Sequence, residues 1–181
     1  IASYLQNLGK RVVLIDANTS FIEQSTNQGL ESYAVNIYDD DLTDNIELND
    51  IGYLIALTGS DAVNKFALKN LASTFGEHGA FRLASADEVK NKNFGNNNQF
   101  FSPKDDYINL SEAVRDFPNL YEIPIHSDKD YRETLEKLHL QLESIPLFVK
   151  TTDNNIYVLS EFETKKLPTK DTVLVYVGQE I

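Results

Sequence analysis

The sequence predicts an α/β protein built around a parallel sheet with helices on both faces. Residues 11–16 and 53–58 are short apolar runs of the kind that form strands covered on both sides. A segment with helical spacing of apolar residues follows each run, so strands and helices alternate along the first half of the chain. This alternation is typical of a Rossmann-like sheet.

Local signals set the ends of the expected elements. A first helix over residues 1–8 should end at Gly9, and Thr19 or Ser20 should cap a second helix that ends before Gly29. The remaining elements expected in this half are strands at 31–38, 53–58 and 79–85 and helices at 61–75 and 86–91.

The pattern weakens after residue 91 and then restarts. We expect a strand end at 100–102 and an amphipathic helix over 110–117, and then a helix that begins at Ser127 in a smaller α/β unit. The strands expected in this unit are 120–125, 145–150, 156–160 and 172–177. The chain is therefore predicted to comprise a first domain at 1–95, a linker with a crossover helix at 96–119, and a small α/β lobe at 120–181.

The composition limits the possible partners. Lys and Arg number 16 and Asp and Glu 28, a formal net charge of −12 that repels phosphate backbones and anionic lipid surfaces. We therefore expect no nucleic-acid partner. The absence of cysteine excludes disulfides and thiolate metal sites.

Asp16 is the leading candidate for a binding residue. It ends the strand at 11–16 and precedes a helix, and an acid in this place accepts hydrogen bonds from ribose hydroxyls in nucleotide-binding βαβ units. The alternative is that Asp16 only caps the turn that follows.

Two further segments are candidates. In the acidic run 39–41, Asp39, Asp41 or the preceding Tyr38 is expected to line a base pocket, unless the run is a solvated loop. Thr58, Gly59 and Ser60 follow the strand at 53–58, where ligands of open α/β sheets collect. Backbone amides there suit a phosphate, whereas Asp61 opposes a bare anion, and an ordinary helix cap is the alternative interpretation.

No reaction is indicated by the sequence. Its three histidines lack the spacing of a zinc motif, and the chain has neither a Gly-x-Ser-x-Gly elbow nor a Tyr-x-x-x-Lys pair. We therefore expect a binding protein without enzymatic activity and without a metal.

The strand and glycine-rich phosphate loop that should precede the first helix are missing. With no methionine, and a helical pattern under way at Ile1, we interpret the chain as a piece of a longer polypeptide. Without that strand, the strands at 11–16 and 53–58 must pair directly or leave a gap. Phosphate binding by the chain as it stands is expected to be weakened or lost.

Several segments together resemble the regulator of potassium conductance (RCK) domain, of the TrkA-N type. They are Tyr4-Leu5, Gly9-Lys-Arg-Val-Val-Leu-Ile-Asp16, residues 39–42, and Ala56-Leu-Thr-Gly-Ser-Asp61 with Asn64. Arg82 resembles an arginine common on the fifth strand of that family. The resemblance covers residues 1–90, and residues 171–178 resemble more loosely the end of the family's second lobe.

The resemblance implies a cytoplasmic regulatory domain of a bacterial inner-membrane protein that transports monovalent cations. It implies NAD(H), AMP, ADP or ATP as ligand, held by Asp16, Asn18 and the 39–41 turn, with Thr58–Ser60 as further contacts. The implied partners are the membrane domain of the same polypeptide and a second copy in a homodimer. Residues 75–82 resemble C-terminal regions of sodium/proton antiporters, and a potassium transport system is the other context.

Two other functions remain open from the sequence. One is a fragment of a Rossmann-type NAD(P)-dependent oxidoreductase, and the other is a structural dimerisation module whose pocket has decayed.

Overall fold

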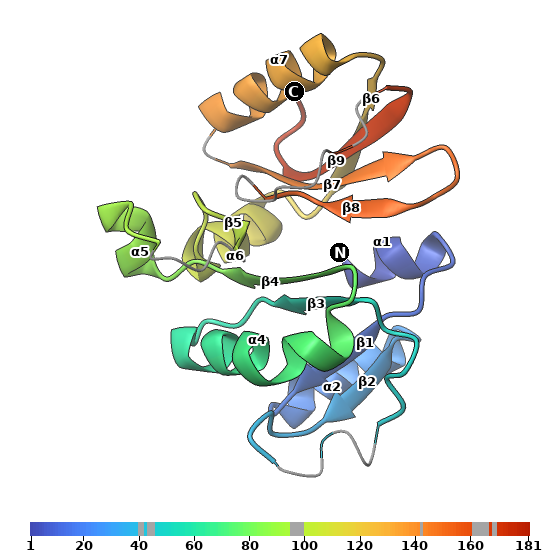
Figure 1. Cartoon of the computed structure of the whole chain (residues 1–181), viewed down its shortest axis with the longest axis vertical. Coiled ribbons are helices and arrows are strands. Elements are labelled where there is room, and N and C mark those ends of the chain that lie inside the picture. Colours follow the sequence, from blue (N-terminus) through green and yellow to red (C-terminus); the bar gives the residue numbers. More distant parts are fainter. Residues whose placement is uncertain (40–41, 43–45, 95–99, 142, 161–166, 168–169) are drawn as a thin grey trace.

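A computed structural model describes residues 1–39, 42, 46–94, 100–141, 143–160, 167 and 170–181. Figure 1 shows two lobes, one above the other, with the N-terminus lying between them. The lower lobe contains the first helices and strands of the chain, and the upper lobe contains the last four strands and α7. The mixed α/β architecture predicted from the sequence is confirmed.

The first part of the lower lobe is a βαβ unit. Its elements are α1 (Ala2–Asn7), β1 (Val13–Asp16), α2 (Thr19–Asn27) and β2 (Glu31–Ala34). The two strands are parallel, with Val13 opposite Glu31 and Asp16 opposite Ala34. Gly9 and Gly29 follow the two helices with φ of +77° and +78°, a backbone conformation that glycine adopts without strain. Both predicted helix ends are thus confirmed.

A three-stranded parallel sheet forms the rest of this lobe. Its elements are β3 (Tyr53–Ala56), α4 (Asp61–Phe75), β4 (Gly79–Leu83), α5 (Ala86–Asn91) and β5 (Phe100–Ser102), with strand order β3-β4-β5. Helices cover both faces: α4 packs on the side of Leu54 and Ala56, while α1 packs on the side of Tyr53 and Ile55. Because β5 pairs with β4, this sheet includes residues 100–102, beyond the expected domain end at residue 95.

The strands β1 and β3 belong to separate sheets. Among the described residues, β1 pairs only with β2 and β3 pairs only with β4. The sequence left two possibilities, direct pairing of these strands or a gap between them. The structure has the gap between β1 and β3. The two sheets are joined instead through side chains, because Phe75 of α4 packs in one cluster with Leu42, Ile46 and Leu48 and with residues of β1 and β2.

Four of the predicted element ends are wrong, and hydrogen bonds from side chains to the backbone explain each of them. The cap of α2 is Asn18, whose side chain accepts from the N–H of Ser20; neither Thr19 nor Ser20 is the cap. The strand β2 ends at Ala34 and not at 38, because the Asn36 side chain turns the chain by accepting from the N–H of Tyr38 at 3.1 Å.

Similarly, β3 ends at Ala56 and not at 58, since Asn64 binds the backbone of Thr58. The expected helix at 110–117 in fact begins at Tyr107, because Asp106 caps it by accepting from the N–H of Asn109 at 3.0 Å.

The upper lobe is an antiparallel sheet with one helix against it. Its elements are β6 (Leu120–Ile125), α7 (Asp128–Leu140), β7 (Ser144–Thr151), β8 (Ile156–Val158) and β9 (Thr172–Gly178), in the strand order β6-β9-β7-β8. The helix α6 (Tyr107–Asp116) connects the two lobes along the chain. Within the described residues, no helix is both long enough and apolar enough to cross a membrane.

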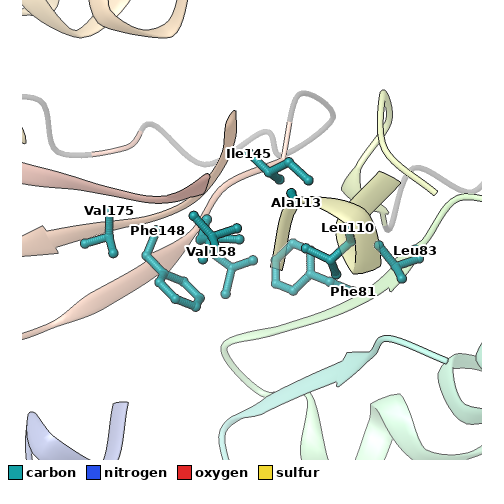
Figure 2. Close-up of a cluster of buried hydrophobic side chains, with 10 residues drawn as sticks. Phe81, Leu83, Leu110, Ala113, Ile145, Phe148, Val158 and Val175 are labelled. Atoms are coloured by element: carbon teal, nitrogen blue, oxygen red, sulfur yellow. The ribbon is translucent and has the colours of Figure 1, made fainter. Parts of the chain in front are cut away.

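A shared apolar core joins the lobes. Figure 2 shows Phe81 and Leu83 of β4 and Leu110 and Ala113 of α6 beside side chains of the upper sheet, and all of them belong to one buried cluster. The members from the upper lobe are Ile145, Leu147, Phe148, Val158, Val175 and Val177. Because α6 buries its apolar face in this cluster, its position depends on both lobes.

Candidate ligand-binding site

The turn after β1 contains two of the predicted binding residues. Asp16 is exposed, and its Oδ1 accepts a hydrogen bond from the N–H of Asn18 at 2.7 Å. Asn18 in turn caps α2 by accepting from the N–H of Ser20 at 3.0 Å. The capping role proposed for Asp16 is therefore present, and it occupies one carboxylate oxygen while the exposed side chain stays accessible to a ligand.

The segment after β2 places Asp39 and Tyr38 on the surface. The N–H of Asp39 donates to the carbonyl of Asn36 at 3.0 Å, which closes a turn. The ring of Tyr38 packs edge-on against Phe66 of α4, with 4.6 Å between the ring centroids, and remains 47% exposed. The third candidate of this run, Asp41, lies outside the described residues.

The turn after β3 brings Thr58, Gly59 and Ser60 together. The buried side chain of Asn64 donates to the carbonyl of Thr58 at 2.9 Å and accepts from its N–H at 3.0 Å and from its hydroxyl at 2.8 Å. Ser60 caps α4, since its hydroxyl accepts from the N–H of Val63 at 3.4 Å. These bonds fix the shape of the turn without a ligand. They also give a structural reason for Asn64, which is one of the residues that resemble the RCK domain.

The turns after β1 and β3 lie on the same side of the lower lobe. In Figure 1 both strands run from the right toward the left of the view, so both carboxyl ends point the same way. Among the hydrogen bonds and ion pairs of the described residues, none connects Asp16 or Asn18 with Thr58, Gly59 or Ser60. The two turns are thus separate groups at one edge.

The buried side chain of Arg82 links the end of β4 to the helix α5 that follows it. Arg82 of β4 is 4% exposed, donates to both carboxylate oxygens of Glu88 at 2.8 and 3.0 Å, and lies 4.3 Å from the centroid of the Phe100 ring. Burial by itself raises the pKa of Glu88, but the bonds from Arg82 and from the N–H of Ser85 outweigh it and lower the pKa to about 2. Arg82 therefore serves the fold and is not free to hold an anion.

The same network balances the charge at the start of α4. Asp61 forms an ion pair with Lys65 at 2.6 Å and lies 3.5 Å from Arg82. Lys65 also lies 4.0 Å from Glu88, so two cations face two carboxylates. Because Asp61 is matched by these cations, it opposes an anionic ligand at this helix start less than the sequence suggested.

One residue beside the turn was not singled out from the sequence. Tyr107, the first residue of α6, packs on the backbone of Gly59: a Cβ atom at position 59 would lie 3.2 Å from its Cδ1. Asp106 directly before the apolar Tyr107 and Ile108 is a recognisable cap signal that would have placed the start of this helix correctly.

The arrangement offers binding groups. It presents an exposed carboxylate at Asp16, hydroxyls at Thr58 and Ser60, and aromatic rings at Tyr38 and Tyr107. Such groups suit the sugar and base of a nucleotide. No group of three or more potential metal-ligating side chains is found among the residues that the structure describes.

A cavity of about 710 Å³ lies elsewhere, between the lobes. It is bordered by Leu5 of α1, by the starts of β3 and β4 at Tyr53 and His78, and by Ile156 of β8. None of the six described candidate residues lines it, so it gives no support to the predicted site.

A family model matches the first part of the chain. Residues 1–96 match the family model of the TrkA-N domain. No curated protein matches the chain. A solved structure described as the crystal structure of the GsuK RCK domain is similar at 11% identity, over 92% of this chain and 43% of that one, with a TM-score of 0.28. The chain thus spans less than half of that structure.

Proposed function

Since this chain belongs to the TrkA-N domain family, we propose that it is a regulatory, nucleotide-sensing domain of a bacterial monovalent-cation transporter. It lies in the cytoplasm, catalyses no reaction, and is attached to the membrane domain of a potassium transport system or a sodium/proton antiporter. The ligand is NAD(H) or an adenine nucleotide such as AMP, ADP or ATP.

The main support for this proposal comes from the turns after β1 and β3, which present an exposed acid and a backbone of fixed shape. The exposed Asp16 follows a parallel strand and precedes a capped helix, as a ribose-binding acid does. The turn at Thr58–Ser60 is held in one shape by Asn64 before binding. A site fixed in this way loses little conformational freedom on binding.

The connection between the lobes supports a regulatory role. The helix α6 packs in the core shared by both lobes, and its first residue contacts the turn at Gly59. A ligand that changes this contact alters the relation of the two lobes. It shifts the transporter toward one state only to the extent that it binds that state more tightly.

A homodimer completes the proposal. On α6, Ile108 is 58% exposed and Val114 is 41% exposed, and apolar side chains of this size on one helix suit contact with a second copy. Sedimentation of the chain should show a dimer, and Ile108→Lys should shift it toward the monomer.

Thermal unfolding with a panel of NADH, NAD⁺, AMP, ADP and ATP tests the sensing function. A nucleotide at 100 times its dissociation constant should stabilise the fold by about 2.7 kcal/mol. That corresponds to a rise in Tm of roughly 5–10 °C, at about 2–4 °C per kcal/mol for a chain of this size. Asp16→Ala should abolish the rise, whereas Asp153→Ala, an exposed acid of the other lobe, should retain it. No rise with any nucleotide at millimolar concentration would contradict the proposal.

A further inference from the structure

Tyr107 borders the turn that carries three of the candidate binding residues. A Cβ atom at Gly59 would lie 3.2 Å from Cδ1, 3.3 Å from Cε1 and 3.5 Å from Cγ of Tyr107, so the ring lies directly on the glycine backbone. The side chain is nevertheless 45% exposed. An aromatic surface contributed by α6 is therefore open to solvent beside Thr58 and Ser60.

The residue before this ring is an acid, which favours the neutral base of a nucleotide over its phosphates. Asp106 immediately precedes Tyr107 and caps α6, whereas Asp61 at the start of α4 is already paired with Lys65 and Arg82. Carboxylates repel a phosphate group and have no such effect on a neutral base. Aromatic rings stack on every nucleobase, because each base has a π-face.

We infer that Tyr107 is a ligand-contacting residue of this site, on whose ring the base of the nucleotide stacks. The inference rests on the proposed nucleotide function and adds a specificity-determining contact to it. Tyr107 selects ligands with a planar ring over sugar phosphates without a base.

The position of Tyr107 gives this contact a further consequence. Three residues along α6, Leu110 is buried in the core that α6 shares with the upper lobe, together with Ala113 (Figure 2). A base stacked on Tyr107 thus contacts the connecting helix itself as well as the turn after β3.

The test compares the affinity of residues 1–181 for two probes by calorimetry. The first is the tightest binder among NADH, AMP, ADP and ATP, and the second is ribose 5-phosphate, which has no base. Tyr107→Ala should weaken binding of the nucleotide about tenfold, in line with the stacking energy of one base, and leave ribose 5-phosphate unchanged. Tyr107→Phe should bind as the wild type does, and so should Glu112→Ala, a control at an exposed position of the same helix.

A second readout uses the fact that the chain has no tryptophan. Tyr107→Trp should give an emission that ADP or ATP quenches, while Leu140→Trp at the end of α7 should not respond. Equal affinity of wild type and Tyr107→Ala for the nucleotide would overturn the inference and leave the nucleotide function intact. Equal weakening of both probes would also overturn it, because Tyr107 would then only support the turn. Absence of binding to the wild type would instead contradict the proposed function itself.

Discussion

Asn64 fixes the backbone of Thr58 from within the helix that follows it. The side-chain amide donates to the Thr58 carbonyl at 2.9 Å, while its oxygen accepts from the Thr58 N–H at 3.0 Å. Because Asn64 is only 2% exposed, these bonds replace water that the end of β3 would otherwise need. The shape of the candidate turn is therefore a property of the fold and is present without ligand.

Asn64→Ala should destabilise the protein by about 1–3 kcal/mol, because it leaves the half-buried backbone N–H and C=O of Thr58 without these partners. Urea unfolding measures this change in the free energy of unfolding. Asn70→Ala on the exposed side of the same helix should cost less than about 1 kcal/mol, since its side chain only donates to the carbonyl of Phe66. Equal losses in the two variants would show that Asn64 has no special role.

Glu88→Gln should weaken the fold at neutral pH and much less in acid. Its folded-state pKa of about 2 lies below the ordinary value of 4.5, so ionised Glu88 stabilises the fold above the ordinary pKa, and this contribution is lost as the pH falls toward 2. We expect a loss of about 3 kcal/mol at pH 7, from the pKa shift and the unpaired Arg82.

The measurement is urea unfolding of the wild type and the variant between pH 2.5 and 7. The difference between them should shrink as the pH falls through the acid range. Glu136→Gln, at an exposed position of α7, should show no such dependence. A difference that stays constant with pH would contradict the assigned role of the ion pair.

The effect of Asp105→Asn on stability should have a pH dependence opposite to that of Glu88→Gln. Burial raises the pKa of Asp105 above 3.8, and the hydroxyl of Ser102 and the nearby His139 and Lys104 only partly offset this. A raised folded-state pKa means that stability is present below pH 3.8 and is lost as the pH rises through the folded-state value. The variant should therefore gain stability relative to wild type as the pH rises from 3.5 to 7 in thermal melts. A stability difference that does not grow over this range would refute the expectation.

Gly59→Ala should push against Tyr107. The added methyl group meets the ring at 3.2 Å, which is closer than an ordinary contact, so the ring or the turn has to shift. We expect a loss of about 1 kcal/mol in the wild type and almost none in the Tyr107→Ala background. The double-mutant cycle from urea unfolding measures this coupling. Additive effects would mean that the two residues do not interact.

The sequence predicted the helices and strands of both lobes because the signals for these elements lie within short segments of the chain. Gly9 and Gly29 ended their helices, and the apolar runs at 11–16 and 53–58 became parallel strands. The TrkA-N match over residues 1–96 confirms the family that those same segments resembled. Periodicity and end signals depend on neighbours within a few residues, which a single sequence displays directly.

One part of what the sequence did not reveal depends on contacts between distant residues. The ring of Tyr107 reaches the turn at Gly59 from another helix. Likewise, β1 and β3 lie in separate sheets because of how strands distant in the sequence pair with one another. No local pattern encodes such contacts, because they exist only once the chain has folded.

The most direct test of the account is a map of backbone amide shifts by NMR, on the 181-residue chain titrated with ATP and with NADH. The account predicts that the perturbed amides cluster at Asp16, Asn18 and Thr58–Ser60, on the edge where the parallel strands end. Absence of any shift at millimolar nucleotide would contradict it. So would shifts confined to the cavity between the lobes, around Tyr53, His78 and Ile156.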